Sequence, residues 1–207
     1  MSKAVILSAC RTPIGSFGGS LKDLTAADLG AVVIREAVGR AGVEPGEIGD
    51  VVLGCVLQGG AGMNVARQAA LKAGLPVEVP AETVNRVCGS GLQAVVHAVE
   101  ALAVGYSDLV VAGGAESMTN APFVLAGARW GYRMGHAQAL DAMILDGLTD
   151  AMHGCHMGLT AEEIAARWQI TRAEQDAFAA ESQRRAIEAI ASGAFKNEIV
   201  AVPVPQK

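Results

Sequence analysis

The chain has 207 residues, of which 51% are hydrophobic and 18% are charged, and its formal net charge is −5. A chain of this length and composition can bury a substantial core, in one large domain or in two small ones. It has no run of about 18 apolar residues, the length that a membrane span needs, and no concentrated basic face for nucleic acid or an anionic membrane.

The cysteines and the start of the sequence bear on the compartment. The four cysteines stand far apart, at positions 10, 55, 88 and 155, and show no close pairing. The apolar run before Arg11 is too brief for a secretory signal. Both features predict a cytoplasmic protein with reduced thiols, and neither nucleic acid nor a membrane is expected as a partner.

The first half of the chain alternates apolar strands with amphipathic helices. Strands are expected over residues 3–9, 50–56, 81–84 and 109–113. Helices are expected over residues 25–42, 64–74 and 89–105. This alternation predicts an α/β fold with a mostly parallel sheet that helices cover on both faces.

Local signals mark the ends of these helices. Thr25 with Asp28 predicts a capping box, and Gly42 ends the first helix. Asn64 and Gly74 bound the second helix in the same way. In the third helix the apolar residues recur at helical spacing: Leu92, Val95, Val96, Val99 and Leu102.

The character of the chain changes after about residue 115. Residues 115–160 are rich in glycine, methionine and histidine and lack clear strands. Helices are expected to begin at Thr160 and Thr171, the second ending at Gly193, before a strand candidate over residues 198–202. The chain is therefore divided into an α/β domain, residues 1–118, and a mainly helical part, residues 119–207.

A glycine-rich loop, residues 58–64, follows a strand and opens a helix, which is the setting of a dinucleotide-binding turn. Val65 stands where the third glycine of that fingerprint belongs. The expected acidic residue would be Glu82, which lies near the start of its strand instead of at the end. A tight connection, or a lid packed close to another backbone, is the favoured interpretation.

The cluster His153-Gly154-Cys155-His156 raises the question of a metal site. Zinc requires four ligands, usually from two separated pairs, and no second pair is visible. No metal is therefore expected. His156 and Met157 are better explained as lining a pocket for a partly apolar ligand.

Cys88 occupies a turn between a strand and a helix, within NRVCGSG at residues 85–91. There the unpaired N–H groups of the helix and its dipole favour the thiolate, which attacks carbonyl carbon. The neighbouring glycines allow a ligand to approach closely. Cys88 is thus either a nucleophile or a buried structural cysteine, since no base can be assigned to it among the four histidines.

Several long motifs, which follow one another in the order known from one protein family, favour the nucleophile over the structural cysteine. They are VILSACRTPIG (residues 5–15), NRVCGSGLQA (85–94), GGAESM (113–118) and DGLTD (146–150), followed by HMG (156–158). Over essentially all 207 residues the sequence resembles the N-terminal half of the thiolases, acetyl-CoA acetyltransferases of the biosynthetic type. The resemblance implies a thiolase-like α/β half followed by part of the loop domain that covers the coenzyme.

The resemblance also implies a reaction and roles for residues. Cys88 would accept an acyl group from acyl-CoA, its backbone N–H helping to hold the oxyanion. Condensation of two acetyl-CoA would give acetoacetyl-CoA, or thiolysis would run in reverse, as part of lipid and fatty acid metabolism. Leu148, His156 and Met157 would line the pantetheine tunnel. No cofactor is implied beyond the coenzyme A thioesters that serve as substrates.

Further expectations concern assembly. The complete family fold is expected to be a homo-oligomer, either a dimer or a homotetramer. The loop around Met63 and Asn64 would approach the active site of a neighbouring subunit, and residues 134–141 would help to form the tetramer. The family's Gly-His-Pro, Asn-Glu-Ala-Phe and Cys-x-Gly-Gly motifs do not occur in these 207 residues. The chain alone is therefore expected to be incomplete and inactive. Two alternatives are a fragment of a fatty-acid-type condensing enzyme and a non-catalytic half-subunit that assembles with a partner.

Overall fold

The computed structural model describes residues 4–204. The described residues form two compact units, one made of residues 4–147 with residues 200–204, the other of residues 148–199. The predicted division into domains of residues 1–118 and 119–207 stays a prediction, because compact units defined by contacts do not test domain boundaries.

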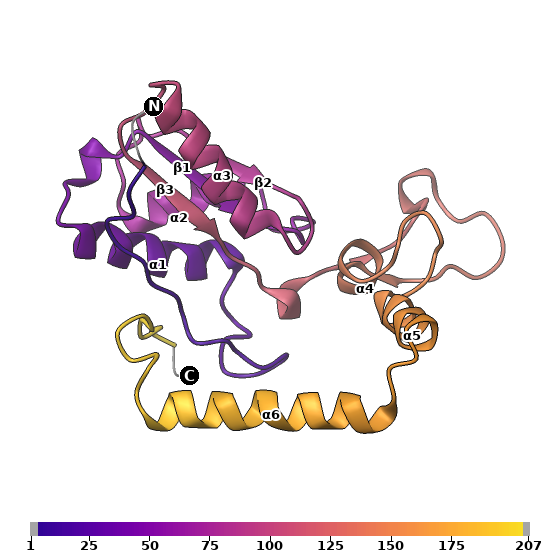
Figure 1. The fold of residues 1–207 in the computed structure, drawn as a ribbon. Helices are drawn as coiled ribbons and strands as arrows, with labels where there is room; N and C mark the ends of the chain where they lie inside the picture. Colours follow the sequence, from indigo (N-terminus) through magenta and orange to yellow (C-terminus); the bar gives the residue numbers. More distant parts are fainter. Residues whose placement is uncertain (1–3, 205–207) are drawn as a thin grey trace. The chain divides into compact units, whose positions relative to one another are not determined.

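A three-stranded parallel sheet forms the centre of the first unit (Figure 1). It consists of β1 (Asp50–Gly54), flanked by β2 (Ala81–Val84) and β3 (Val110–Gly114). The last residue of β1 lies opposite the last residues of both neighbours, so the carboxyl ends of the three strands share one edge. This confirms the predicted parallel α/β fold.

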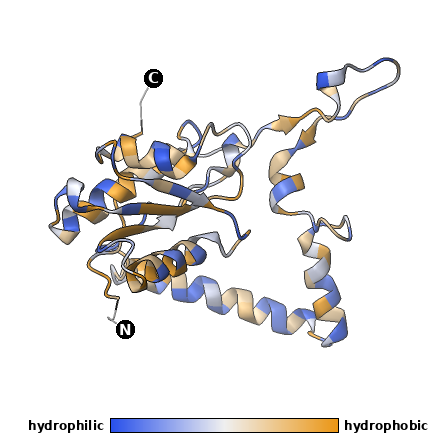
Figure 2. Ribbon diagram, turned by 90° about the horizontal axis from the view of Figure 1, so that it is seen from above, coloured by the Kyte–Doolittle hydropathy of each residue, from blue (hydrophilic) through white to orange (hydrophobic). Residues whose placement is uncertain are grey.

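Helices cover both faces of this sheet. Side chains of β1 alternate between the faces, and Val51 and Leu53 pack with residues of α1 (Ala26–Ala41) and α2 (Val65–Ala73) in one buried cluster. Gly54 points to the other face, where α3 (Ser90–Ala103) lies against β1 and β3. The strands are mainly hydrophobic, as the hydropathy colours in Figure 2 show, because both of their faces are covered.

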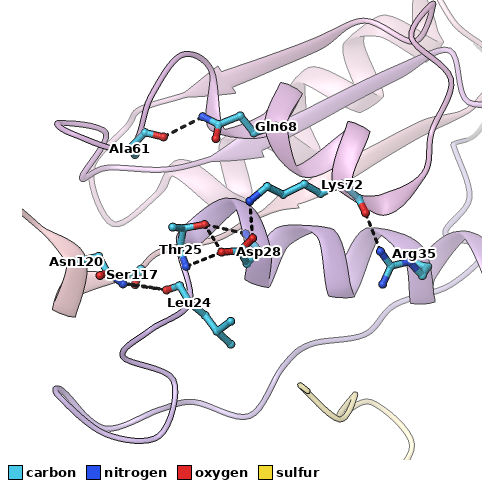
Figure 3. Close-up of polar contacts among 9 residues, drawn as sticks. All are labelled: Leu24, Thr25, Asp28, Arg35, Ala61, Gln68, Lys72, Ser117 and Asn120. Carbon is cyan, nitrogen blue, oxygen red and sulfur yellow. Dashed lines mark hydrogen bonds and ion pairs between the residues drawn. The ribbon is translucent and has the colours of Figure 1, made fainter. Parts of the chain in front are cut away.

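The predicted caps of α1 and α2 are confirmed. The Thr25 side chain accepts from the Asp28 N–H while the Asp28 carboxylate accepts from the Thr25 N–H (Figure 3). Asp28 also forms an ion pair with Lys72, which ties α1 to α2. Asn64 caps α2, and Gly74 ends it in the left-handed conformation.

The strand predicted over residues 3–9 is wrong for the described residues 4–9, which form no strand. Two polar groups attach this segment to α1, as the Ser8 hydroxyl donates to the Ala37 carbonyl and the Cys10 thiol donates to the Val33 carbonyl. Its apolar side chains, Val5 and Ile6, are exposed. An apolar run becomes a strand only where another strand accepts its backbone hydrogen bonds, and here the segment lies along a helix.

The apolar stripe of α3 exists, but it does not pack on the sheet. The residues of α3 that are buried are small: Ser90, Ala94 and Ala98. The larger apolar residues lie on the exposed side of the helix: Leu92, Val95, Val96 and Val99. Small residues face the sheet because the backbones of α3 and β1 approach too closely for larger ones.

Short elements complete the first unit. They are η1 (Pro45–Glu47), η2 (Met118–Asn120), β4 (Phe123–Val124), η3 (Ala128–Trp130), β5 (Leu140–Asp141) and α4 (Ala142–Gly147). Strands β4 and β5 pair antiparallel, which corrects the expectation that residues 115–160 lack strands. Residues 198–202 form no continuous strand, although the Val200 N–H donates to the Arg11 carbonyl at 2.8 Å.

The second unit contains α5 (Met157–Arg167) and α6 (Arg172–Ala191). Thr171 and Glu174 form the predicted capping box of α6, which ends at Ala191, just before Gly193. Helix α5 begins at Met157 and not at Thr160, because the His156 ring nitrogen caps it by accepting from the Gly158 N–H. No helix between residues 4 and 204 is long and apolar enough to cross a membrane.

Candidate active site at the carboxyl edge of the sheet

Cys88 lies just beyond the carboxyl end of β2 and directly before Gly89, the residue at the N-terminus of α3. The predicted strand, turn and helix around the cysteine are therefore confirmed. The Cys88 residue is exposed. Ligands of parallel α/β sheets bind at this edge, outside the carboxyl ends of the strands.

The turn that carries Cys88 has unusual backbone geometry. Val87 has φ of 48°, in the left-handed region that side chains with a branched β-carbon rarely adopt. The Asn85 side-chain oxygen accepts from the Val87 N–H at 2.9 Å, and the Ser90 hydroxyl donates to the Val87 carbonyl at 2.6 Å. The Ser90 hydroxyl oxygen also accepts from the Arg86 N–H at 2.8 Å. Two side chains therefore bind the backbone on both sides of Val87.

The start of α3 rests directly on the central strand. A Cβ atom built on Gly54 would lie 2.4 Å from the carbonyl carbon of Ser90 and 2.6 Å from the Gly91 nitrogen. A Cβ on Gly114 would lie 3.2 Å from the Gly54 oxygen. Glycine at the ends of β1 and β3 thus sets how deeply the helix sits. These glycines were not identified from sequence, since their partners are distant in the chain.

Glu116 and Cys55 form a second polar group at the same edge. The Glu116 carboxylate accepts from the Cys55 thiol at 3.3 Å, the Val56 N–H at 2.9 Å and the Leu57 N–H at 3.0 Å. Burial, together with the nearby Glu116 charge, raises the pKa of Cys55 to about 12. Glu116 was not identified from sequence as a site residue, and its position shortly after β3 is the signal that could have revealed it.

The structure distinguishes the cysteines from one another. Cys55 is buried and stays protonated at neutral pH, so it is not a nucleophile. Burial also raises the pKa of Cys10, whose thiol donates to a carbonyl of α1. Cys88 is the exposed cysteine of the carboxyl edge, which makes it the candidate nucleophile there.

The predicted pocket residues Leu148, His156 and Met157 all lie in the second unit. The Met157 N–H donates to the Leu148 carbonyl at 2.8 Å, and Thr149 pairs with His156 in an antiparallel bridge. The three residues are thus held together at the start of α5. His156 accepts at Nδ1, so its neutral ring carries its proton on Nε2. Their role in binding pantetheine stays a prediction.

The other sequence motifs have structural explanations. The His153 ring bonds to the Asp150 carboxylate at 3.1 Å, and hydrogen bonds from the His153 backbone and ring lower the pKa of Asp150. Among residues 4–204, no group of three or more His, Cys, Asp or Glu side chains could hold a metal ion. In the glycine-rich loop, the Gln68 amide donates to the carbonyls of Ala61 and Met63, both at 2.9 Å. Figure 3 shows the bond to Ala61. These bonds make the loop a tight connection.

Comparisons with known proteins agree with this architecture. The family model described as thiolase, N-terminal domain, matches residues 4–207. An acetyl-CoA acetyltransferase of Pseudomonas aeruginosa is 53% identical over 207 residues, which cover 100% of this chain and 53% of that protein. One of Syntrophomonas wolfei is 52% identical over 99% of this chain and 52% of that protein. A probable acetyl-CoA acyltransferase of Staphylococcus aureus is 48% identical over 100% of this chain and 53% of that protein. The chain spans about half the length of the curated relatives it matches.

Proposed function

The chain belongs to the thiolase family, and from this premise we propose that Cys88 accepts an acyl group from acyl-CoA in thiolase-type acyl transfer. The observation that carries the proposal is the exposed Cys88 at the turn before α3, on the carboxyl edge of the sheet. The printed names of the relatives, acetyl-CoA acetyltransferases, indicate acetyl-CoA as the substrate class. No cofactor takes part in this proposal.

In the acylation step the Cys88 thiolate attacks the carbonyl carbon of acetyl-CoA. The carbon–sulfur bond to coenzyme A breaks, the coenzyme leaves as a thiolate that takes up a proton, and Cys88 holds the acetyl group as a thioester. The Cys88 N–H donates to the oxyanion that forms in this step. In the condensation step a base removes a methyl proton from a second acetyl-CoA. The resulting carbanion attacks the acyl group, giving acetoacetyl-CoA and free Cys88, and thiolysis is the reverse.

The second unit supplies the proposed coenzyme contacts. Leu148, His156 and Met157 would line the passage for the pantetheine arm, and their clustering at the start of α5 supports this. The Nε2–H of His156 is a hydrogen-bond donor suited to a pantetheine amide. Cytoplasmic location and a place in lipid and fatty acid metabolism are part of the same proposal.

Assembly is also proposed. The loop around Met63 and Asn64 would reach a neighbouring subunit's site, and residues 134–141 would contribute to a homotetramer. The exposed side chains of Met63 and Met134 support both contacts, since each is at least nine-tenths exposed (90% and 99%).

We expect these 207 residues alone not to complete the condensation. They contain neither the Gly-His-Pro nor the Cys-x-Gly-Gly motif from which the family draws its activating histidine and its base, and a positioned base contributes on the order of 10²–10⁴-fold. The exposed apolar side of α3 favours a second candidate, a half-subunit that assembles with a partner polypeptide.

Incubation with acetyl-CoA followed by peptide mass mapping tests the proposal. We expect the acetyl group on Cys88, and none on that peptide in Cys88→Ala, while Cys155→Ala behaves like the wild type. Acetylation at another residue would contradict the assignment. Faster transfer from an acyl carrier protein than from acetyl-CoA would favour a fatty-acid-type condensing enzyme.

A second experiment tests the expected inactivity of the chain alone. Acetoacetyl-CoA thiolysis is measured with and without a polypeptide that supplies the two motifs, and full turnover by the chain alone would contradict the expectation.

A further inference from the structure

We propose that Ser90 and Asn85 are positioning residues for Cys88. They hold Val87 in its left-handed conformation and so fix the direction of the peptide group that carries the Cys88 N–H. The proposal rests on the proposed function in one respect, that Cys88 is the acyl acceptor. Its geometry concerns the turn alone.

Val87 adopts an unfavourable conformation that its own side chain does not explain. Among residues 4–204, the non-glycine residues with positive φ are Asn64, Val87 and Gln169, and Val87 alone of these has a branched β-carbon. Its side chain is 47% exposed, so burial does not hold the residue in place. A strained backbone persists only where its surroundings fix it. The hydrogen bonds of the turn must therefore do so.

Those hydrogen bonds come from two side chains. Asn85 accepts from the Val87 N–H at 2.9 Å, which fixes the peptide group before Val87. Ser90 donates to the Val87 carbonyl at 2.6 Å, which fixes the peptide group after it. The Ser90 N–H also donates to that carbonyl, at 3.0 Å. Rotation of the backbone at Val87 would break bonds on both sides.

The link to Cys88 follows from the planarity of the peptide bond. The Val87 carbonyl and the Cys88 N–H belong to the same planar group and point in opposite directions. By holding the carbonyl, the Ser90 hydroxyl therefore also sets the direction of the Cys88 N–H, the donor proposed for the oxyanion. A donor aimed in advance at developing charge is what lowers the barrier in such sites.

Ser90 is itself well anchored. It is 4% exposed, and its backbone lies against Gly54 of the central strand. Its hydroxyl both donates, to Val87, and accepts, from the Arg86 N–H at 2.8 Å. Alanine can do neither. The turn is thus tied through Ser90 to the buried central strand of the sheet.

Two reactions of Cys88 test the proposal in Ser90→Ala and Asn85→Ala. One is alkylation by iodoacetamide, which needs an accessible thiolate but forms no oxyanion, and the other is acetylation by acetyl-CoA. Both rates are read by mass mapping of the Cys88 peptide. Ser107→Ala is the matched control, because Ser107 is also buried and its hydroxyl also bonds to nearby backbone, that of Leu109.

We expect each variant to acetylate Cys88 about five- to tenfold more slowly, while alkylation stays within about twofold of wild type. Ser107→Ala should change neither rate. In a Val87→Gly background the loss caused by Ser90→Ala should shrink, because glycine enters the left-handed region without help. Thermal unfolding establishes that each variant is folded. Should Ser90→Ala not fold, the exposed Asn85 decides the outcome.

Acetylation within twofold of wild type in a folded variant would overturn the proposal. An equal fall in alkylation and acetylation would overturn it too, because it would show reduced access to the thiol and no specific effect on the oxyanion donor. Equal losses from Ser90→Ala with and without the Val87→Gly substitution would overturn it as well. If acetyl-CoA fails to modify even the wild-type Cys88, the proposed function fails. Acetylation of Cys88 by p-nitrophenyl acetate, which forms an oxyanion without coenzyme A, then still tests the positioning role by the same comparison.

Discussion

Gly54 and Ser90 pack backbone against backbone at the carboxyl edge of the sheet, and a Cβ atom on Gly54 would lie 2.4 Å from the Ser90 carbonyl carbon. No side-chain movement can relieve such a contact, since the opposing atoms belong to the first turn of α3. The position of the turn before α3, and hence of Cys88, therefore depends on the absence of a single carbon atom in β1.

Gly54→Ala should push the start of α3 away from the sheet. Overpacking of this kind costs about 1–3 kcal/mol in the free energy of unfolding, and we expect urea unfolding to show a loss in that range together with slower acetylation of Cys88. Gly39→Ala is the control, because a Cβ at Gly39 meets nothing within 4 Å inside helix α1. It should stabilise the chain slightly. Unchanged stability of Gly54→Ala would contradict the close packing.

Cys55 should resist labelling in the folded chain. With a pKa of about 12, its thiolate is on the order of 10⁴-fold less abundant than its thiol at pH 8. We expect iodoacetamide to label Cys88 first, and Cys55 only after unfolding in urea. If native Cys55 were labelled at the rate of Cys88, its burial beside Glu116 would not protect the thiol, which would contradict its raised pKa.

Glu116→Gln tests the other half of that pair. The substitution removes the charge that contributes to the raised pKa of Cys55 and leaves one acceptor oxygen for three donors. We expect native Cys55 to label faster and the midpoint of urea unfolding to fall, because donors lose their acceptor. Glu78→Gln, at an exposed position, should change neither.

Stability should also fall in alkaline solution. The pKa of Cys55 is 9.0 ordinarily and about 12 in the folded chain, so between these values the unfolded chain releases the thiol proton while the folded chain keeps it. The free energy of unfolding therefore decreases as pH rises through this window. Comparing wild type with Cys55→Ala by urea unfolding from about pH 8 to 11 isolates this contribution. A difference that stays constant with pH would contradict the assignment.

The exposed side of α3 should drive self-association of the isolated chain. Leu92 is 72% exposed and Val96 39% exposed on a continuous apolar face, and such faces associate in water. Replacing both with glutamate should shift the chain toward monomer in sedimentation velocity. Val104→Glu, which changes an equally apolar residue at the end of the same helix, should leave association unchanged. A wild-type chain that is monomeric at all concentrations would count against this.

Local features of the fold were predictable from the sequence because their physics is local. Each predicted capping box depends on two residues three positions apart, Thr25 with Asp28 and Thr171 with Glu174. Both capping boxes form as expected. The strand, turn and helix around Cys88 follow from a short apolar run, two glycines and helical spacing, and the structure confirms them. The first apolar run failed as a strand since pairing requires a partner that no local signal reveals.

Sequence alone was enough to locate the main helices, the three central strands, the family and the place of Cys88 at a turn. Tertiary packing selected the side of α3 that meets the sheet, because the closeness of two backbones favours Ala94 and Ala98 over the larger Leu92. It also brought Glu116 to Cys55, 61 residues apart in the chain. Contacts of this kind depend on the register of strands that are distant in the chain and on the space left where a residue such as Gly54 has no Cβ. Neither the register nor this space produces a pattern along the sequence.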